Sequence, residues 1–119
     1  MADGSTYIAP TDFAPEEAEA WRGVLLRAAD EMDRRGLAKG TQCDAKGRVC
    51  LAGALNFVAF GDFSYRNPLQ DLEAYQRLQK YLRTLPGDVS HVPGSWHNEP
   101  HRTKAECVAA LRNCANQGR

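Results

Sequence analysis

The stretch that decides the fold is VCLAGALNFVAFG, residues 49–61. Apolar side chains occupy nearly every position, so a helix formed here would be apolar on all sides and would need to be buried. The stretch is much shorter than the ~20 residues that a membrane-spanning helix needs. It therefore predicts a central helix of a globular protein that ends at Gly61. Ala52, Gly53 and Ala54 are small enough to let a neighbouring helix approach closely.

Amphipathic patterns on both sides of this stretch predict two further helices. After Pro15, apolar residues recur at steps of three and four until Gly36, a suitable left-handed cap. Another pattern follows Asn67, a candidate cap, and Pro68, a favoured first helical residue, and ends before Pro86. The predicted buried residues of these helices are Ala18, Trp21, Val24, Leu25, Ala28, Met32, Leu69, Leu72, Tyr75, Leu78 and Leu82.

The last helix is predicted from its first turn. Thr103 followed three residues later by Glu106 is a capping-box signature. The apolar positions behind it predict a buried face, and two cysteines on that face are seven residues apart, too far along one helix to form a disulfide with each other. The predicted buried residues are Cys107, Val108, Leu111, Cys114 and Ala115.

These elements fit one small domain. The chain has 119 residues, enough for a single core. We expect an N-terminal arm over residues 1–13 and one helical domain over 14–119. Residues 44–47 have turn chemistry, which predicts a small β-hairpin or tight loop near 41–50. The fold class is therefore mainly α, a bundle of about four helices, because strands and helices do not alternate.

Composition narrows the function classes. Fifteen basic residues balance fifteen acidic ones, whereas a dedicated nucleic-acid binder needs a basic excess for phosphate contacts. The sequence shows no signal peptide and no membrane-length apolar run, so we expect a cytoplasmic protein with no membrane partner and with reduced cysteines. No motif implies a cofactor, and the oligomeric state is left open.

Four residues raise the hypothesis of a structural zinc site: Cys43, Cys50, His97 and His101. Six residues separate the two cysteines, whereas structural zinc usually takes tight knuckles with two to four intervening residues. The same cysteines could form a redox pair across a hairpin, or they could be unrelated packing residues. The spacing favours packing.

A second hypothesis is a small cysteine-dependent hydrolase. Cys50 precedes the central helix, whose N-terminus would lower a thiol pKa, and His97 could serve as its base, with Asn98 or Glu99 as the third group. The apolar context RVCLAGAL favours a buried, inert thiol instead. The sequence leaves enzymatic activity uncertain and favours a protein that is not an enzyme.

The long loop 86–102 gathers Trp96, His97, Asn98 and Arg102. One interpretation is structural, with Trp96 plugging a helix seam beside Trp21. The other is a recognition surface, since Trp and Arg frequently anchor interfaces. The recognition hypothesis makes these four residues partner-binding, together with Asp44 and Arg48 of the predicted turn.

The segments RVCLAGAL, residues 48–55, and WHNEPHRTKAE, residues 96–106, resemble motifs of a family of small uncharacterised proteins from actinobacteria and their phages. The family pattern has the forms RVCxxGAL and WN(D/E)…RT..E. This chain departs from it at Leu37, where an aromatic residue is frequent, at His97, which splits the Trp-Asn pair, and at Glu99, which replaces the usual Asp. The matching residues are 25–36, Asp44, 47–50, 53–55, Trp96, Asn98, Arg102, Thr103 and Glu106.

The resemblance implies the helical fold and the host range, and it carries no activity. Cys43 lies outside the family pattern, which weakens the zinc hypothesis. Together with the composition, the family resemblance leads us to expect a small cytoplasmic protein of phage or prophage type that acts by binding a host protein.

Overall fold

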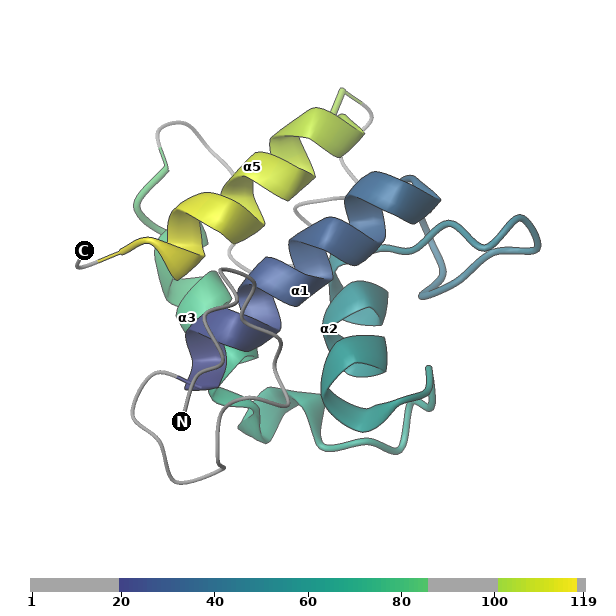
Figure 1. Cartoon of the computed structure of the whole chain (residues 1–119), viewed down its shortest axis with the longest axis horizontal. Helices are drawn as coiled ribbons and strands as arrows, with labels where there is room; N and C mark the ends of the chain where they lie inside the picture. The colour runs from purple at the N-terminus through teal and green to yellow at the C-terminus, as the bar shows by residue number, and fades with distance from the viewer. Residues whose placement is uncertain (1–19, 86–100, 118–119) are drawn as a thin grey trace, which may run out of the picture.

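A computed structural model describes residues 20–85 and 101–117 of the chain. Within these ranges the chain forms four α-helices and one short 3-10 helix, and β-pairing is limited to two isolated bridges (Figure 1). The predicted mainly α fold is confirmed. The helices are α1 (Ala20–Arg35), α2 (Leu51–Phe60), α3 (Glu73–Leu82) and α5 (Lys104–Ala115), and the 3-10 helix η2 spans Leu69–Asp71.

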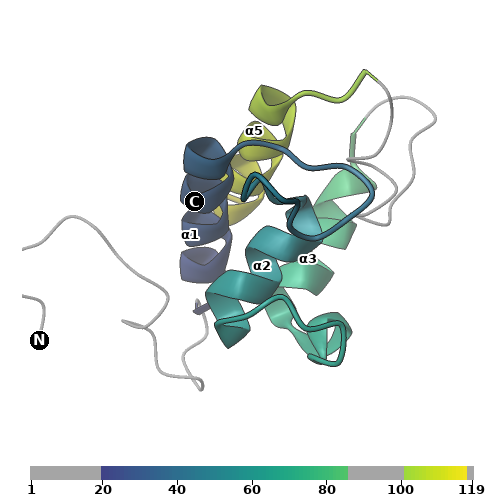
Figure 2. The same cartoon turned by 90° about the vertical axis from the view of Figure 1, so that its right-hand side faces the viewer.

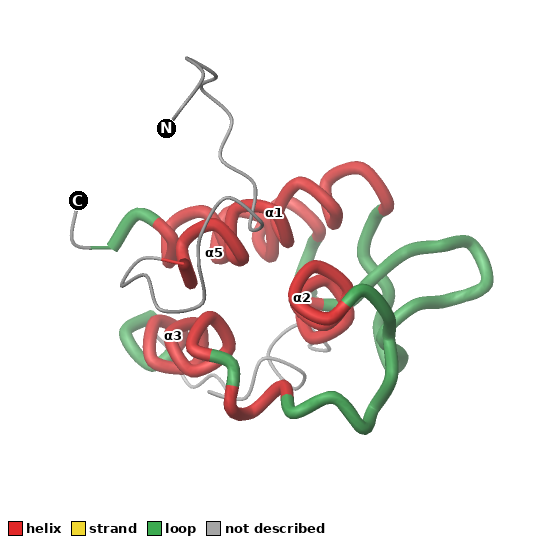
Figure 3. Tube along the Cα trace, turned by 60° about the horizontal axis from the view of Figure 1, so that its bottom comes forward, coloured by secondary structure: helices red, strands yellow, loops and turns green. Residues whose placement is uncertain are grey.

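The four helices form two layers. α1 and α5 lie side by side and antiparallel: Lys104, at the start of α5, donates to the carbonyl of Asp33 near the end of α1, at 3.0 Å. At the other end of the pair, Arg22 donates to the carbonyl of Ala115 at 2.5 Å. Figure 3 shows α2 and α3 almost end-on beneath this pair. The hydrophobic core fills the space between the two layers.

The predicted apolar stripes supply most of this core. Val24, Leu69 and Leu72 are only partly buried, and Ala18 lies outside the described residues. The predicted residues that are buried are Trp21, Leu25, Ala28, Met32, Tyr75, Leu78, Leu82, Cys107, Val108, Leu111, Cys114 and Ala115.

Helix α2 is the predicted central helix, and it ends as predicted with Gly61 in a left-handed conformation, φ 84°. The small residue Gly53 has a different use from the one predicted. A Cβ at this position would overlap the carbonyl group of Gln42, so the close neighbour is the backbone of a loop and not another helix. Cys50 N–H donates to the same carbonyl at 3.2 Å, which fixes the loop on the first turn of α2.

The segment between α1 and α2 is a loop with one tight turn, which Figure 2 shows curving from one helix to the other. Val49 pairs with Leu37 in a parallel bridge and with Cys43 in an antiparallel bridge. Asp44 N–H donates to the carbonyl of Arg48 at 3.0 Å. The predicted turn near 41–50 is therefore present as a tight turn with single bridges, because its pairing stops before a two-stranded ladder can form.

Helix α3 begins later than predicted. Asn67 does not cap it and Pro68 is not its first residue, because Leu72 has extended backbone, φ −76° and ψ 124°, and separates η2 from α3. The side-chain amide of Asn67 instead donates to Asn56 and Asp62. Asn67 and Pro68 do precede a helical segment, but that segment is the short 3-10 helix η2 and not α3.

The predicted capping box at the start of α5 is confirmed. The Thr103 hydroxyl accepts from Glu106 N–H at 3.2 Å, and a Glu106 carboxylate oxygen accepts from Thr103 N–H at 2.9 Å. Cys107 and Cys114 are buried in the core, as predicted, and burial raises their pKa to about 12 and about 11. In the ranges 20–85 and 101–117, no helix has both the length and the apolar character that crossing a membrane requires.

Candidate functional site

A pocket of about 530 Å³ opens beside the first turns of α2. Its walls are residues 40–42, one side of α2 with its cap Cys50, residues 64–65 and 67–71, and Tyr75 of α3. This volume falls within the range of pockets that take small molecules. We call it the amide pocket, because carboxamide side chains form part of its wall.

Three carboxamides around this pocket are joined in one row of hydrogen bonds. Asn67 Nδ2 donates to Asp62 Oδ1 at 2.6 Å and to Asn56 Oδ1 at 2.8 Å. Asn56 Nδ2 in turn donates to Gln42 Oε1 at 2.9 Å and to the carbonyl of Ser64 at 2.8 Å. We call Asp62, Asn67, Asn56 and Gln42 the amide chain. It connects three segments that are far apart in the sequence and holds the pocket wall in place.

The carboxylate at the start of the amide chain fixes its direction. An ionised carboxylate only accepts hydrogen bonds, so Asn67 must present its NH₂ to Asp62. The hydrogen bond from Asn67, with a second from the N–H of Ser64, lowers the pKa of the Asp62 carboxyl. Asn56 is almost fully buried, at 1% exposure. A buried carboxamide left without partners would be costly, so this row is well determined.

Cys50 lies at the pocket wall but has the properties of a structural thiol. It is the N-cap of α2, and its sulfur accepts from the N–H of Gly53 at 3.2 Å. Burial raises the pKa of the Cys50 thiol, and the hydrogen bond from Gly53 only partly offsets this. Thiolate chemistry needs the opposite shift. His97, its predicted base, lies outside the described residues.

The turn residues Asp44 and Arg48 bind each other. Arg48 Nε donates to Asp44 Oδ2 at 2.6 Å, and Asp44 Oδ1 accepts from the N–H groups of Lys46 and Arg48. Partial desolvation raises the pKa of the Asp44 carboxyl, but the hydrogen bonds from Arg48 and Lys46 outweigh it and leave the pKa below its usual value. Asp44 therefore stabilises the turn. About half of the Arg48 side chain is exposed, so Arg48 can still contact a partner.

An arginine-aromatic surface adjoins this turn. The Arg35 guanidinium lies over the ring of Phe57, 4.8 Å from its centroid, and donates to the carbonyl of Gly47 at 3.4 Å. Phe57 stacks on Phe63, with centroids 5.2 Å apart and planes 16° apart. Phe60, at the end of the same helix, is 38% exposed. We call Arg35, Phe57, Phe60 and Phe63, with the 44–48 turn, the turn face.

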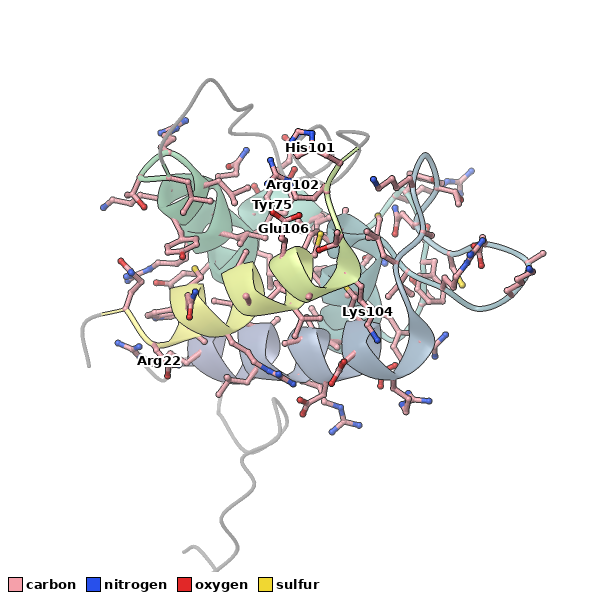
Figure 4. The ribbon with its side chains drawn as sticks, turned by 90° about the horizontal axis from the view of Figure 1, so that it is seen from above. Arg22, Tyr75, His101, Arg102, Lys104 and Glu106 are labelled. Atoms are coloured by element: carbon pink, nitrogen blue, oxygen red, sulfur yellow. The ribbon has the colours of Figure 1, made fainter. Side chains whose placement is uncertain are left out.

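Arg102, another predicted partner-binding residue, lies at the start of α5 and not on the turn face. Arg102 has only 9% of its side chain exposed, and its Nη1 lies 3.5 Å from Glu106 Oε2 at the start of α5. Figure 4 shows His101, Arg102 and Glu106 at this end of α5. Trp96, His97 and Asn98 lie outside the described residues. The predicted packing of Trp96 beside Trp21 therefore stays a prediction.

The described members of the predicted zinc site do not form a metal-binding cluster. Cys50 is committed to Gly53, Cys43 is only partly buried, and His101 is exposed. Over residues 20–85 and 101–117, no cluster of three or more His, Cys, Asp or Glu side chains could hold a metal ion. The fourth predicted ligand, His97, is outside these ranges.

The amide chain was missed from the sequence. One signal was present, since Asn56 is a polar residue within the apolar stretch 49–61. A buried Asn needs several partners, and polar loop residues would have to supply them. Which loop residues do so depends on the path of the chain around α2, and the local pattern does not specify that path.

Fold and site together define a small helical domain with a ligand-sized pocket that carries polar side chains, and an arginine-aromatic surface. Residues 17–117 match a family of unknown function, DUF6197, and the chain belongs to that family. Neither the comparison with curated proteins nor the comparison with solved structures gave a match.

Proposed function

We propose that this protein acts by binding a protein partner through the turn face. The observation that carries the proposal is the Arg35 guanidinium over the stacked Phe57–Phe63 pair, beside a turn that presents Arg48. Arginine and aromatic side chains are enriched where protein interfaces gain most of their binding energy. The sequence predicted Asp44 and Arg48 as partner-binding residues, and the proposal extends this prediction to the whole turn face.

The charges around the turn face favour an acidic partner. Arg34 has 66% of its side chain exposed, and Arg48 has 48%. The nearest carboxylate on α1, Glu31, is buried and already accepts from Arg34 and Arg35. Partial desolvation raises the Glu31 pKa, but the hydrogen bonds from Arg35 and Arg34 prevail and keep it lowered. Positive side chains thus dominate the exposed part of this surface.

We propose further that the partner is a host protein and that this chain is a cytoplasmic protein of phage or prophage type. The motif resemblance supports this origin. The alternative of a cysteine-dependent hydrolase finds less support, because burial raises the pKa of Cys50 instead of lowering it. The zinc alternative has no cluster of ligands within the described ranges.

The test is affinity purification of the tagged protein from an actinobacterial lysate, comparing Arg35→Lys with wild type. Lysine keeps the charge beside Glu31 but loses the planar stack over Phe57. We expect one stoichiometric host protein whose recovery falls strongly in Arg35→Lys. Arg77→Lys is the matched control, because Arg77 also stacks on an aromatic ring, 4.4 Å from the Trp21 centroid, and belongs to α3.

One further variant and a folding control complete the test. Trp96→Ala tests the predicted contribution of the 86–102 loop, and circular dichroism shows whether each variant remains folded. If Arg35→Lys and Arg77→Lys retain the partner equally well, the turn face is not the binding surface. A loss that occurs only with Trp96→Ala would assign recognition to the loop instead.

A further inference from the structure

The amide chain ends in a hydrogen-bond donor, Gln42 Nε2, that has no partner in the described part of the chain. Each carboxamide is oriented by the one before it, from the Asp62 carboxylate to Gln42, whose Oε1 accepts from Asn56. Gln42 therefore presents its Nε2 at the far end. Among residues 20–85 and 101–117 this Nε2 donates to no partner, and it is not sealed from solvent. Gln42 lines the amide pocket, so the donor is available there.

Other polar groups of the pocket wall are similarly uncommitted. The hydroxyl of Tyr75 makes no hydrogen bond within the described part of the chain, although the residue is only 8% exposed. Asn67 uses both hydrogens of its NH₂, which leaves its Oδ1 as an unused acceptor. The pocket thus offers donors at Gln42 and Tyr75 and an acceptor at Asn67. A ligand that matches the pocket therefore carries both hydrogen-bond acceptors and a hydrogen-bond donor.

The rest of the wall restricts the ligand's charge and shape. Among the described residues that line the pocket, Asp71 is the charged one, and there is no Lys or Arg to hold a phosphate. Tyr65 lines the same pocket and is 79% exposed. An exposed aromatic ring at the edge of a pocket suits stacking with a planar ring. These features favour an uncharged, planar molecule.

From these observations we propose that the amide pocket binds a small uncharged planar molecule that carries a ring carbonyl and a ring N–H, as in a pyrimidinone base. A ring carbonyl accepts from Gln42 Nε2, the Tyr75 hydroxyl donates to a carbonyl of the ligand, and the ring N–H donates to Asn67 Oδ1. The ring stacks on Tyr65. This activity is separate from partner binding at the turn face, since none of the turn-face residues lines the pocket.

The test is a titration of the ¹⁵N-labelled full chain with uridine, followed by ¹H–¹⁵N spectra. We expect saturable shifts at residues 40–42, 52–56 and 64–71. 3-Methyluridine lacks the ring N–H and should bind roughly tenfold more weakly, as the loss of one paired hydrogen bond predicts. Uridine 5′-monophosphate should bind no more tightly than uridine, because the pocket has no cation for the phosphate.

Two variants connect the binding to named atoms. Gln42→Glu keeps the acceptor for Asn56 and replaces the Nε2 donor, so uridine affinity should fall roughly tenfold or more. Gln79→Glu on α3 is its matched control. Tyr75→Phe keeps the buried ring and removes only the hydroxyl, and it should also weaken binding, whereas Tyr81→Phe should not.

Several outcomes would overturn the proposal. They are the absence of saturable shifts with uridine in the millimolar range, equal binding of 3-methyluridine, or tighter binding of the monophosphate. Unchanged uridine affinity in folded Gln42→Glu and Tyr75→Phe would also reject it. Because Tyr75→Phe is nearly isosteric, it keeps the test decisive even if Gln42→Glu fails to fold.

Discussion

The carbonyl of Gln42 lies directly against Gly53. A Cβ added to Gly53 would approach the Gln42 carbonyl carbon to 2.8 Å and would overlap its oxygen. This contact holds the loop on α2, where Cys50 N–H donates to the same carbonyl. It also positions the Gln42 side chain at the end of the amide chain. One glycine of the RVCLAGAL motif therefore supports both the fold and the pocket.

Gly53→Ala should destabilise the protein. Gly53 lies inside a helix, where alanine alone would stabilise by about 1 kcal/mol relative to glycine. The backbone overlap with Gln42 should reverse this sign and cost about 1–3 kcal/mol, the usual range for overpacking. Urea unfolding monitored by circular dichroism measures the difference.

The matched control is Ala59→Gly in the same helix, at a partly buried position. It should cost about 1 kcal/mol, from helix propensity alone. If Gly53→Ala instead raised the free energy of unfolding, the close contact with Gln42 would not exist in solution.

The four thiols should differ in reactivity. Cys43 is partly buried, whereas Cys50, Cys107 and Cys114 are buried and burial raises the pKa of each. With iodoacetamide at neutral pH, native protein should gain one adduct, on Cys43, and unfolded protein four. Intact-mass and peptide mass spectrometry read this out. Rapid, selective alkylation of Cys50 in native protein would restore the hydrolase hypothesis.

The capping box gives a third expectation. Thr103→Ala removes the side-chain acceptor for the N–H of Glu106 and should lower the free energy of unfolding by about 1 kcal/mol. Thr103→Ser keeps the hydroxyl and should cost much less. Equal losses in the two variants would mean that the hydroxyl is not what stabilises the start of α5.

Local patterns were sufficient to predict the helices. The apolar stretch around Leu51 and Leu55 predicts a buried helix, and both residues are buried. The capping box at Thr103 predicts where α5 begins. The predicted start of α3 was wrong because Asn67 and Pro68 produce the same local signal for a 3-10 turn as for an α-helix. Only the extended backbone at Leu72 distinguishes the two, and packing against the rest of the fold determines it.

The site was much less predictable. Asp44 and Arg48 were found, because turn chemistry is local. Gln42, Asn56 and Asn67 were not, because their hydrogen bonds join residues 11 and 14 positions apart through the path of two loops. The pairing of Arg35 with Phe57 depends in the same way on how α1 meets α2. Residue type alone does not give such pairings.

Stability should fall in acid partly through Asp62. The hydrogen bonds from Asn67 and Ser64 lower the pKa of the folded Asp62 carboxyl below its unfolded value. The stabilisation is therefore fully present above the unfolded pKa and is lost as pH falls through the folded pKa. Asp62→Asn should flatten the acid limb of a urea-unfolding series. An unchanged acid limb in Asp62→Asn would show that the amide chain does not start from an ionised carboxylate.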